Sequence, residues 1–133
     1  CASGLSMTTG LVASDDSLLL DPLDQPHAEQ LLGELMQAWQ AGMRQPLPIA
    51  VKTAFAWLGQ TDALKAQAAA RKAYEGDGLT TDGERRESVA LARQFTDYDA
   101  LVADETFADW CDALYRPLLE APWRSVSSEE PRP

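Results

Sequence analysis

The chain has few residues of the kinds that small metal-binding and disulfide-linked domains use. Its 133 residues include one histidine and two cysteines. These are too few for the usual zinc site, in which four cysteine and histidine ligands come in closely spaced pairs. Two cysteines also fall short of the disulfide framework of small secreted domains, so we expect a reducing, cytoplasmic setting. The sequence predicts no bound metal and no cofactor.

Long apolar runs and a basic leader are missing as well. The apolar stretches are a few residues long, whereas a membrane span needs about 20 residues. No positively charged start followed by an apolar stretch opens the chain, so we expect no export signal and no membrane partner. Residue 1 is a cysteine followed by Ala-Ser-Gly, which indicates a piece of a longer protein.

Acidic residues outnumber basic ones, and the excess is uneven along the chain. The formal net charge is −10. Residues 1–43 carry six acids and no lysine or arginine, whereas residues 44–93 carry eight bases and six acids. Residues 94–133 return to nine acids and three bases. A free-standing nucleic-acid binder is normally basic, so the balance argues against that class. The basic middle is either a solvated helical surface or one wall of a path completed by another chain.

The spacing of apolar residues predicts a mainly helical α+β fold that begins with a β-hairpin. Apolar residues alternate with small or polar ones from Leu5 to Leu11, polar residues at 14–17 favour a turn, and Leu18–Leu20 form a second apolar run. We expect one helical domain over residues 1–120. The segment 121–133 contains three prolines and predicts a flexible tail.

The strongest helical pattern lies between residues 28 and 43, where apolar residues recur on one face. Pro26 suits the first turn of this helix, and Gly42 suits its end. Trp39 lies on this apolar face, and we interpret it as a core residue. The residues of the face are Ala28, Leu31, Leu32, Leu35, Met36, Trp39 and Met43.

Shorter apolar stripes predict further helices along the rest of the chain. They lie at 51–58, 62–75, 84–95, 98–102 and 107–118. Gly59 ends the first, and Thr61 is a good N-cap for the second, whose apolar face is built from small residues. Asp97 and Asp104 open the last two, and Pro117 kinks or ends the final helix. Trp110 and Cys111 fall on the apolar stripe of that helix, so we expect both to be buried.

No catalytic arrangement is complete in the sequence. His27 is the single histidine, and no motif near it supplies a nucleophile for a Ser-His-Asp type of triad. Gly78 and Gly83 have the spacing of a phosphate-binding loop, but Glu84 follows where that motif needs a lysine. Lys52 has an alanine two residues before it, where a two-metal nuclease would place an acid. We therefore predict no catalytic residues, and the hypothesis of a small hydrolase is disfavoured.

One region of the sequence suits binding better than catalysis. Arg44, Lys52 and Thr53 surround the elbow at 45–48, which leads into the start of a helix. Free backbone N–H groups and the helix dipole favour an anion at such a start, so these residues are candidates for a phosphate contact. A plain crossing between two helices is the alternative. Trp57 lies off the apolar stripe of its helix, which makes it a candidate for a partner contact.

Several segments, in a fixed order, carry a resemblance to a known family. They read LLGELMQAWQAGMRQPLP at 31–48, KTAFAWL at 52–58, AYEG at 73–76, LARQF at 91–95 and LYRPLL at 114–119. In order and spacing they resemble the C-terminal region of RecC, the gamma subunit of exodeoxyribonuclease V. The resemblance covers about residues 1–119.

The resemblance implies a role in an assembly rather than a reaction. It implies a non-catalytic scaffold and strand-guiding portion of a bacterial RecBCD-type helicase and nuclease, which processes double-strand DNA ends for recombinational repair. The implied partners are RecB-like and RecD-like helicase subunits, with DNA reached through the intact heterotrimer. The implied fold is part of a restriction-endonuclease-like domain that has lost its catalytic residues. A stand-alone helical adaptor, which would bind another protein through Trp57 and the alanine-rich helix, is the alternative.

Overall fold

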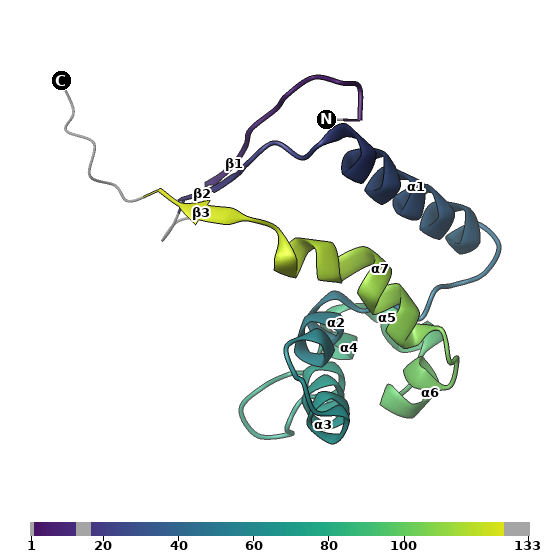
Figure 1. The fold of residues 1–133 in the computed structure, drawn as a ribbon. Helices are drawn as coiled ribbons and strands as arrows, with labels where there is room; N and C mark the ends of the chain where they lie inside the picture. The colour runs from purple at the N-terminus through teal and green to yellow at the C-terminus, as the bar shows by residue number, and fades with distance from the viewer. Residues whose placement is uncertain (1, 13–16, 127–133) are drawn as a thin grey trace. The chain divides into compact units, whose positions relative to one another are not determined.

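The computed structural model describes residues 2–12 and 17–126. Its contacts divide the chain into two compact units, unit 1 (Cys1–Leu35 with Glu120–Pro133) and unit 2 (Met36–Leu119). The fold is mainly helical with a small antiparallel sheet, as the sequence predicts (Figure 1). In chain order the elements are β1 (Thr9–Val12), β2 (Ser17–Leu20), α1 (Gln25–Gly42), α2 (Val51–Leu58), α3 (Ala63–Glu75), α4 (Glu84–Glu87), α5 (Val89–Gln94), α6 (Tyr98–Val102), α7 (Phe107–Glu120) and β3 (Trp123–Ser125).

The sheet of unit 1 joins the two ends of the described chain. β2 is its central strand, paired antiparallel with β1, where Thr9 lies opposite Leu20, and with β3, where Leu18 lies opposite Ser125. The pairing of β1 and β2 confirms the predicted hairpin. Strand β1 is shorter than the alternation from Leu5 to Leu11 suggests. It begins at Thr9, so Leu5 and Met7 lie before it. The predicted turn falls at 13–16, outside the described residues.

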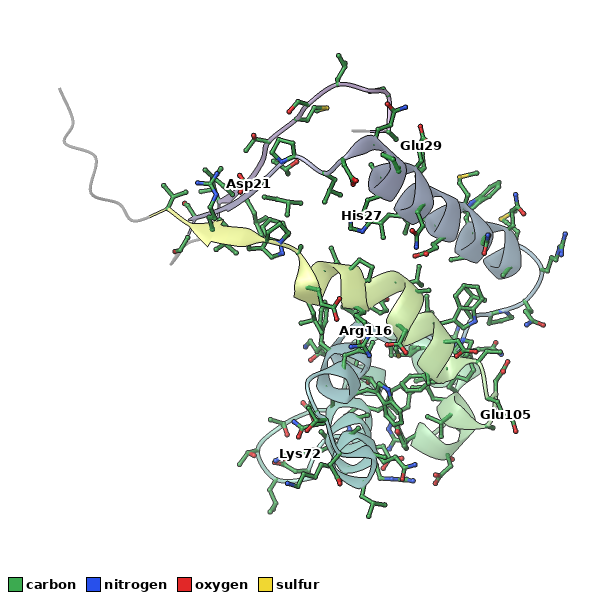
Figure 2. The ribbon with its side chains drawn as sticks, in the orientation of Figure 1. Asp21, His27, Glu29, Lys72, Glu105 and Arg116 are labelled. Carbon is green, nitrogen blue, oxygen red and sulfur yellow. The ribbon has the colours of Figure 1, made fainter. Side chains whose placement is uncertain are left out.

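Strand β3 lies within the segment for which the sequence predicts a flexible tail. Its register with β2 is fixed by backbone pairing and by one ion pair at the edge of the sheet. Arg124 donates from Nε to Asp21 Oδ2 at 3.0 Å and from Nη2 to Asp21 Oδ1 at 2.5 Å. Figure 2 labels Asp21 beside these strands. Residues 127–133 of the predicted tail lie outside the described residues.

Helix α1 has the predicted boundaries but not the predicted burial. It begins at Gln25, with Pro26 as its second residue, and ends at Gly42. Ala38 is its one buried residue, whereas Trp39 is 61% exposed and Met43 is 71% exposed. The interpretation of Trp39 as a core residue is therefore wrong. Periodicity identifies residues that share a helix face, but it does not tell whether the chain supplies anything to cover that face.

Helices α2 and α3 pack through small side chains. Ala54 on α2 and Ala70 on α3 are fully buried, as expected for helices that approach closely. The end of α2 is as predicted, with the Gly59 amide donating to the Phe55 carbonyl at 3.0 Å. The start of α3 differs by one residue. Its N-cap is Asp62 rather than Thr61, because the Asp62 carboxylate accepts the Lys65 amide at 2.9 Å.

The segment predicted as one helix over 84–95 is two short helices, α4 and α5. They separate at Ser88, which has an extended backbone (φ −123°, ψ 104°). The Ser88 hydroxyl oxygen accepts the Leu91 amide at 3.3 Å and so caps α5. Serine competes with the helix for backbone hydrogen bonds, which explains the break. The next element, α6, is as predicted, and Asp97 caps it by accepting the Ala100 amide at 2.8 Å.

Helix α7 completes the core of unit 2. It starts at Phe107, after Asp104 has accepted the Thr106 amide at 3.0 Å, and it continues through Pro117 to Glu120. Cys111 is fully buried, as predicted, and burial raises the pKa of its thiol to about 12. Trp110 is half-buried rather than buried. Among residues 2–12 and 17–126, none of the helices combines the length and the hydropathy that a membrane span requires.

Candidate functional site

The start of α2, where the sequence predicts an anion, holds a carboxylate of this chain. Glu84, the first residue of α4, accepts the Lys52 amide at 3.1 Å through Oε1. Its Oε2 accepts the Thr53 amide at 2.9 Å and the Thr53 hydroxyl at 2.9 Å. Thr53 is fully buried, so the hydroxyl needs this partner within the protein. Glu84 therefore serves as an N-terminal cap for α2 from a distant part of the chain.

The local sequence of α2 explains why a distant cap is needed. Ala50 occupies the N-cap position and makes no side-chain hydrogen bond, because the alanine side chain has no acceptor oxygen. The first amides of a helix have no partner within the helix, and the helix dipole makes this end favourable for negative charge. A carboxylate satisfies both conditions at once. The phosphate contact stays a prediction, and in this structure Glu84 occupies the first amides of α2.

Two glycines allow the chain to bring Glu84 to this position. Gly83 lies against the end of α3, where a Cβ would overlap the carbonyl oxygen of Tyr74. Gly76 has φ +81°, which favours glycine, and a Cβ there would overlap the carbonyl oxygen of Thr81. The chain between α3 and α4 can therefore close tightly, with Gly76 bridged to Asp82.

Within this connection, Asp77 organises the loop. Its carboxylate accepts the amides of Leu79, Thr80 and Thr81 at 2.8–3.1 Å, and the Thr80 hydroxyl at 2.7 Å. These hydrogen bonds, the Thr80 hydroxyl first, hold the pKa of Asp77 far below its usual range. Lys72 Nζ, labelled in Figure 2, lies 3.5 Å from Asp77 Oδ2. The ion pair therefore ties the loop to α3. This helps to hold Glu84 at the start of α2.

The other predicted contact residues near the elbow have separate environments. The Lys52 ammonium forms an exposed ion pair with Glu87, with 2.5 Å between Nζ and Oε2. Arg44 is exposed in the connection after α1, where its amide donates to the Ala41 carbonyl at 2.9 Å. The structure therefore brings Lys52 and Thr53 together on one carboxylate and leaves Arg44 apart. A phosphate at the backbone of α2 would have to displace Glu84.

Trp57 contacts the core of unit 2 and also lines a cavity. Its ring meets Phe107 edge-on, with 5.7 Å between the centroids, and it is half-buried. The cavity it lines has a volume of about 530 Å³, and residues of α3, α6 and the start of α7 form the other walls. Trp57 is thus neither a core residue nor a freely projecting side chain.

A charged group that sequence reasoning missed borders the same cavity. Arg71 donates to both carboxylate oxygens of Asp99, at 3.0 Å and 2.5 Å, and its guanidinium lies 4.8 Å from the centroid of the Tyr98 ring. These hydrogen bonds lower the pKa of Asp99 and raise that of Arg71. Glu75 completes the group by accepting the Tyr98 amide at 2.9 Å. No local pattern connects Arg71 to Asp99, which lies on another helix.

The site has the features of a packed and internally paired surface. Over residues 2–12 and 17–126, no group of three or more histidine, cysteine, aspartate or glutamate side chains is arranged to hold a metal ion. Glu84, Thr53, Arg71 and Asp99 are engaged in helix capping and ion pairing, whereas the buried Tyr98 hydroxyl has no hydrogen-bond partner among the described residues.

The family comparison bears on the part of the chain that contains the predicted site residues. The RecC C-terminal domain family model matches residues 1–62. The resemblance to RecC is confirmed over this segment. It spans β1, β2, α1 and α2 and contains all four predicted contact residues, Arg44, Lys52, Thr53 and Trp57.

The RecC match ends before α3, so the later motifs are not included. The segments at 73–76, 91–95 and 114–119 lie outside the matched residues, and the RecC resemblance there stays a prediction. Glu84 and Glu87, the partners of the α2 start, also lie outside it. Comparisons with curated proteins and with solved structures give no significant match.

Proposed function

We propose that this chain is a non-catalytic scaffold and strand-guiding portion of a RecBCD-type helicase and nuclease. The observation that carries the proposal is the RecC C-terminal domain match over residues 1–62. In such an assembly, RecB-like and RecD-like helicase subunits would be its partners. The complex would process double-strand DNA ends for recombinational repair. The chain would contribute shape and contact surface, while bond cleavage would belong to another subunit.

The geometry of the α2 start supports a structural role for its polar residues. Glu84 accepts three hydrogen bonds from Lys52 and Thr53, and Thr53 is fully buried. Groups used in this way hold α4 against α2, which supports a structural rather than a catalytic role for them in this proposal. We further propose that the segment derives from a restriction-endonuclease-like domain that has lost its catalytic residues.

The scaffold proposal is tested by co-purification. The full gene product that contains this chain would be co-expressed with the two helicase subunits of the same genome, one of which carries an affinity tag. We expect a complex with one copy of each subunit, measured by light scattering after size exclusion. A tagged helicase pair expressed alone is the control. If the protein elutes separately from both helicase subunits, the scaffold proposal is wrong and the stand-alone adaptor takes its place.

Strand guiding is tested separately, through the exposed cations near the elbow. Replacing Arg44 and Lys52 together with alanine would remove two positive charges while Glu84 keeps its backbone partners. If these side chains meet phosphates, log Kd of the intact complex for a single strand should depend on log salt with a slope about 1–2 units smaller. An unchanged slope would exclude strand guiding by these residues and leave the scaffold proposal intact.

A further inference from the structure

The cavity of unit 2 combines an aromatic wall with an acidic rim. The half-buried ring of Trp57 and the buried ring of Phe107 meet edge-on at 5.7 Å and form the aromatic part. Asp104 and Glu105, in the exposed connection between α6 and α7, form the rim. The volume of about 530 Å³ lies within the range of cavities that bind small ligands.

The charge of the cavity is negative after its internal pairing is taken into account. Arg71 is the one cation among the lining residues, and both of its hydrogen bonds to Asp99 are made within the protein. Asp104 and Glu105 therefore leave an excess of two negative charges. Hydrogen bonds from Thr106 lower the pKa of Asp104, so this carboxylate stays ionised well below neutral pH.

The carboxylates of Asp104 and Glu105 are exposed, so a partner can reach them. Figure 2 labels Glu105 at the turn between α6 and α7, and its side chain is exposed and lines the cavity. Asp104 uses Oδ1 to accept the Thr106 amide at 3.0 Å, and a carboxylate can accept several hydrogen bonds. An occupant that enters over Trp57 would meet both acids at the rim.

We propose that this cavity binds an arginine-containing segment of a partner protein. The alkyl stem of the arginine would lie on the half-buried ring of Trp57, which Phe107 contacts edge-on, and the guanidinium would gain a cation–π contact with the Trp57 ring. The guanidinium would then donate to Asp104 or Glu105 in a charge-assisted pair. A nucleic-acid strand is a poor occupant, because its phosphates would meet the acidic rim. The inference concerns unit 2 alone and does not depend on the assembly proposed above.

The test uses the whole chain, labelled with ¹⁵N, and a short peptide amide in which two arginines flank a leucine. The signal of the Trp57 indole N–H, assigned with Trp57→Phe, should shift saturably as the peptide is added. A matched peptide with citrulline, which has the same shape as arginine but no charge, should bind at least about tenfold more weakly. Equal shifts with both peptides, or no shift at millimolar peptide, would overturn the proposal.

Variants locate the binding within the cavity. Glu105→Gln keeps the size of the side chain and should weaken arginine-peptide binding about three- to tenfold, because it removes one charge from the rim. Asp109→Asn changes the net charge of the chain equally, but Asp109 does not line the cavity. It should bind as the parent does. Equal weakening by the two variants would indicate a general charge effect and contradict the proposal.

Other occupants give distinct results in the same experiment. A single-stranded oligonucleotide that shifts the Trp57 signal in place of the peptide would assign the cavity to nucleic acid and overturn the proposal. Concentration-dependent dimerisation of the chain that Glu105→Gln abolishes would assign the cavity to a second copy and overturn it as well. Shifts confined to the arginine peptide would support it.

Discussion

Unit 1 and unit 2 differ in how they exclude water. The buried hydrophobic residues of the described chain all lie in unit 2, among them Tyr74, Leu101 and Cys111. In unit 1, by contrast, none of the described residues is buried, and the strands of its sheet are half-buried or exposed. Unit 2 is therefore stabilised by a hydrophobic core, whereas unit 1 depends on backbone pairing between three short strands, which is marginal in water.

The difference between the two units predicts that truncating a core residue of unit 2 lowers the free energy of unfolding most. Leu101 is fully buried, so Leu101→Ala should lower the free energy of unfolding by about 2–5 kcal/mol through lost burial and the cavity left behind. The measurement is urea denaturation followed by circular dichroism. Leu19→Ala, in the half-buried β2, is the matched truncation in unit 1 and should cost no more than about 1 kcal/mol. Similar losses would contradict the difference between the units.

A smaller effect is predicted where α4 caps α2. Glu84→Ala leaves the buried Thr53 hydroxyl and two amides without their acceptor, which should cost about 1–3 kcal/mol in urea denaturation. Glu87→Ala, three residues further on, removes only the exposed pair with Lys52 and should cost about 0–1 kcal/mol. If the two variants were equally stable, Glu84 would not be the cap of α2.

The loop of unit 2 that Asp77 organises should give pH-dependent stability. The folded pKa of Asp77 lies below its ordinary value of 3.8, so its stabilising contribution is present above 3.8 and is lost as the pH falls through the lower folded value. Asp77→Asn should therefore melt below the parent at pH 7, and the gap should narrow as the pH falls below 3.8. Asp109→Asn, an exposed control in the first turn of α7, should melt closer to the parent than Asp77→Asn does at pH 7. A gap that is constant with pH would contradict this account.

The smallest effect is predicted at the ion pair of unit 1. Arg124→Ala removes the exposed pair with Asp21, and it should leave the global unfolding transition unchanged within error. Hydrogen exchange of the β3 amides should become faster, because the pair lies beside the pairing of β2 with β3. Lys72→Ala, which removes an exposed pair in unit 2, is the control and should leave exchange in β3 unchanged.

The sequence predicted elements whose signals are local. The boundaries of α1 and α2, the pairing of β1 with β2, and the Asp97 cap of α6 follow from periodicity and capping within a few residues. The break at Ser88 also had a local signal, because serine is a frequent N-cap, but the apolar stripe of 84–95 concealed it.

Features that depend on distant residues were not predictable in this way. Glu84 accepts the amide of Thr53, which lies 31 residues earlier in the chain. Strand β3, near the C-terminus, pairs with β2, near the N-terminus. Helix geometry marked the start of α2 as favourable for negative charge, but the sequence could not show that Glu84 would occupy it. Likewise, the apolar face of α1 was recognised, while the 61% exposure of Trp39 depends on which parts of the chain lie against it.

The proposed function requires that this chain contributes contact surface to a larger assembly and cleaves no bond itself. The most direct measurement incubates the purified chain in excess with end-labelled single-stranded and double-stranded DNA in the presence of Mg²⁺ or Mn²⁺. We expect no cleavage above a protein-free control. Cleavage that co-elutes with the chain and disappears on addition of a chelator would contradict the claim.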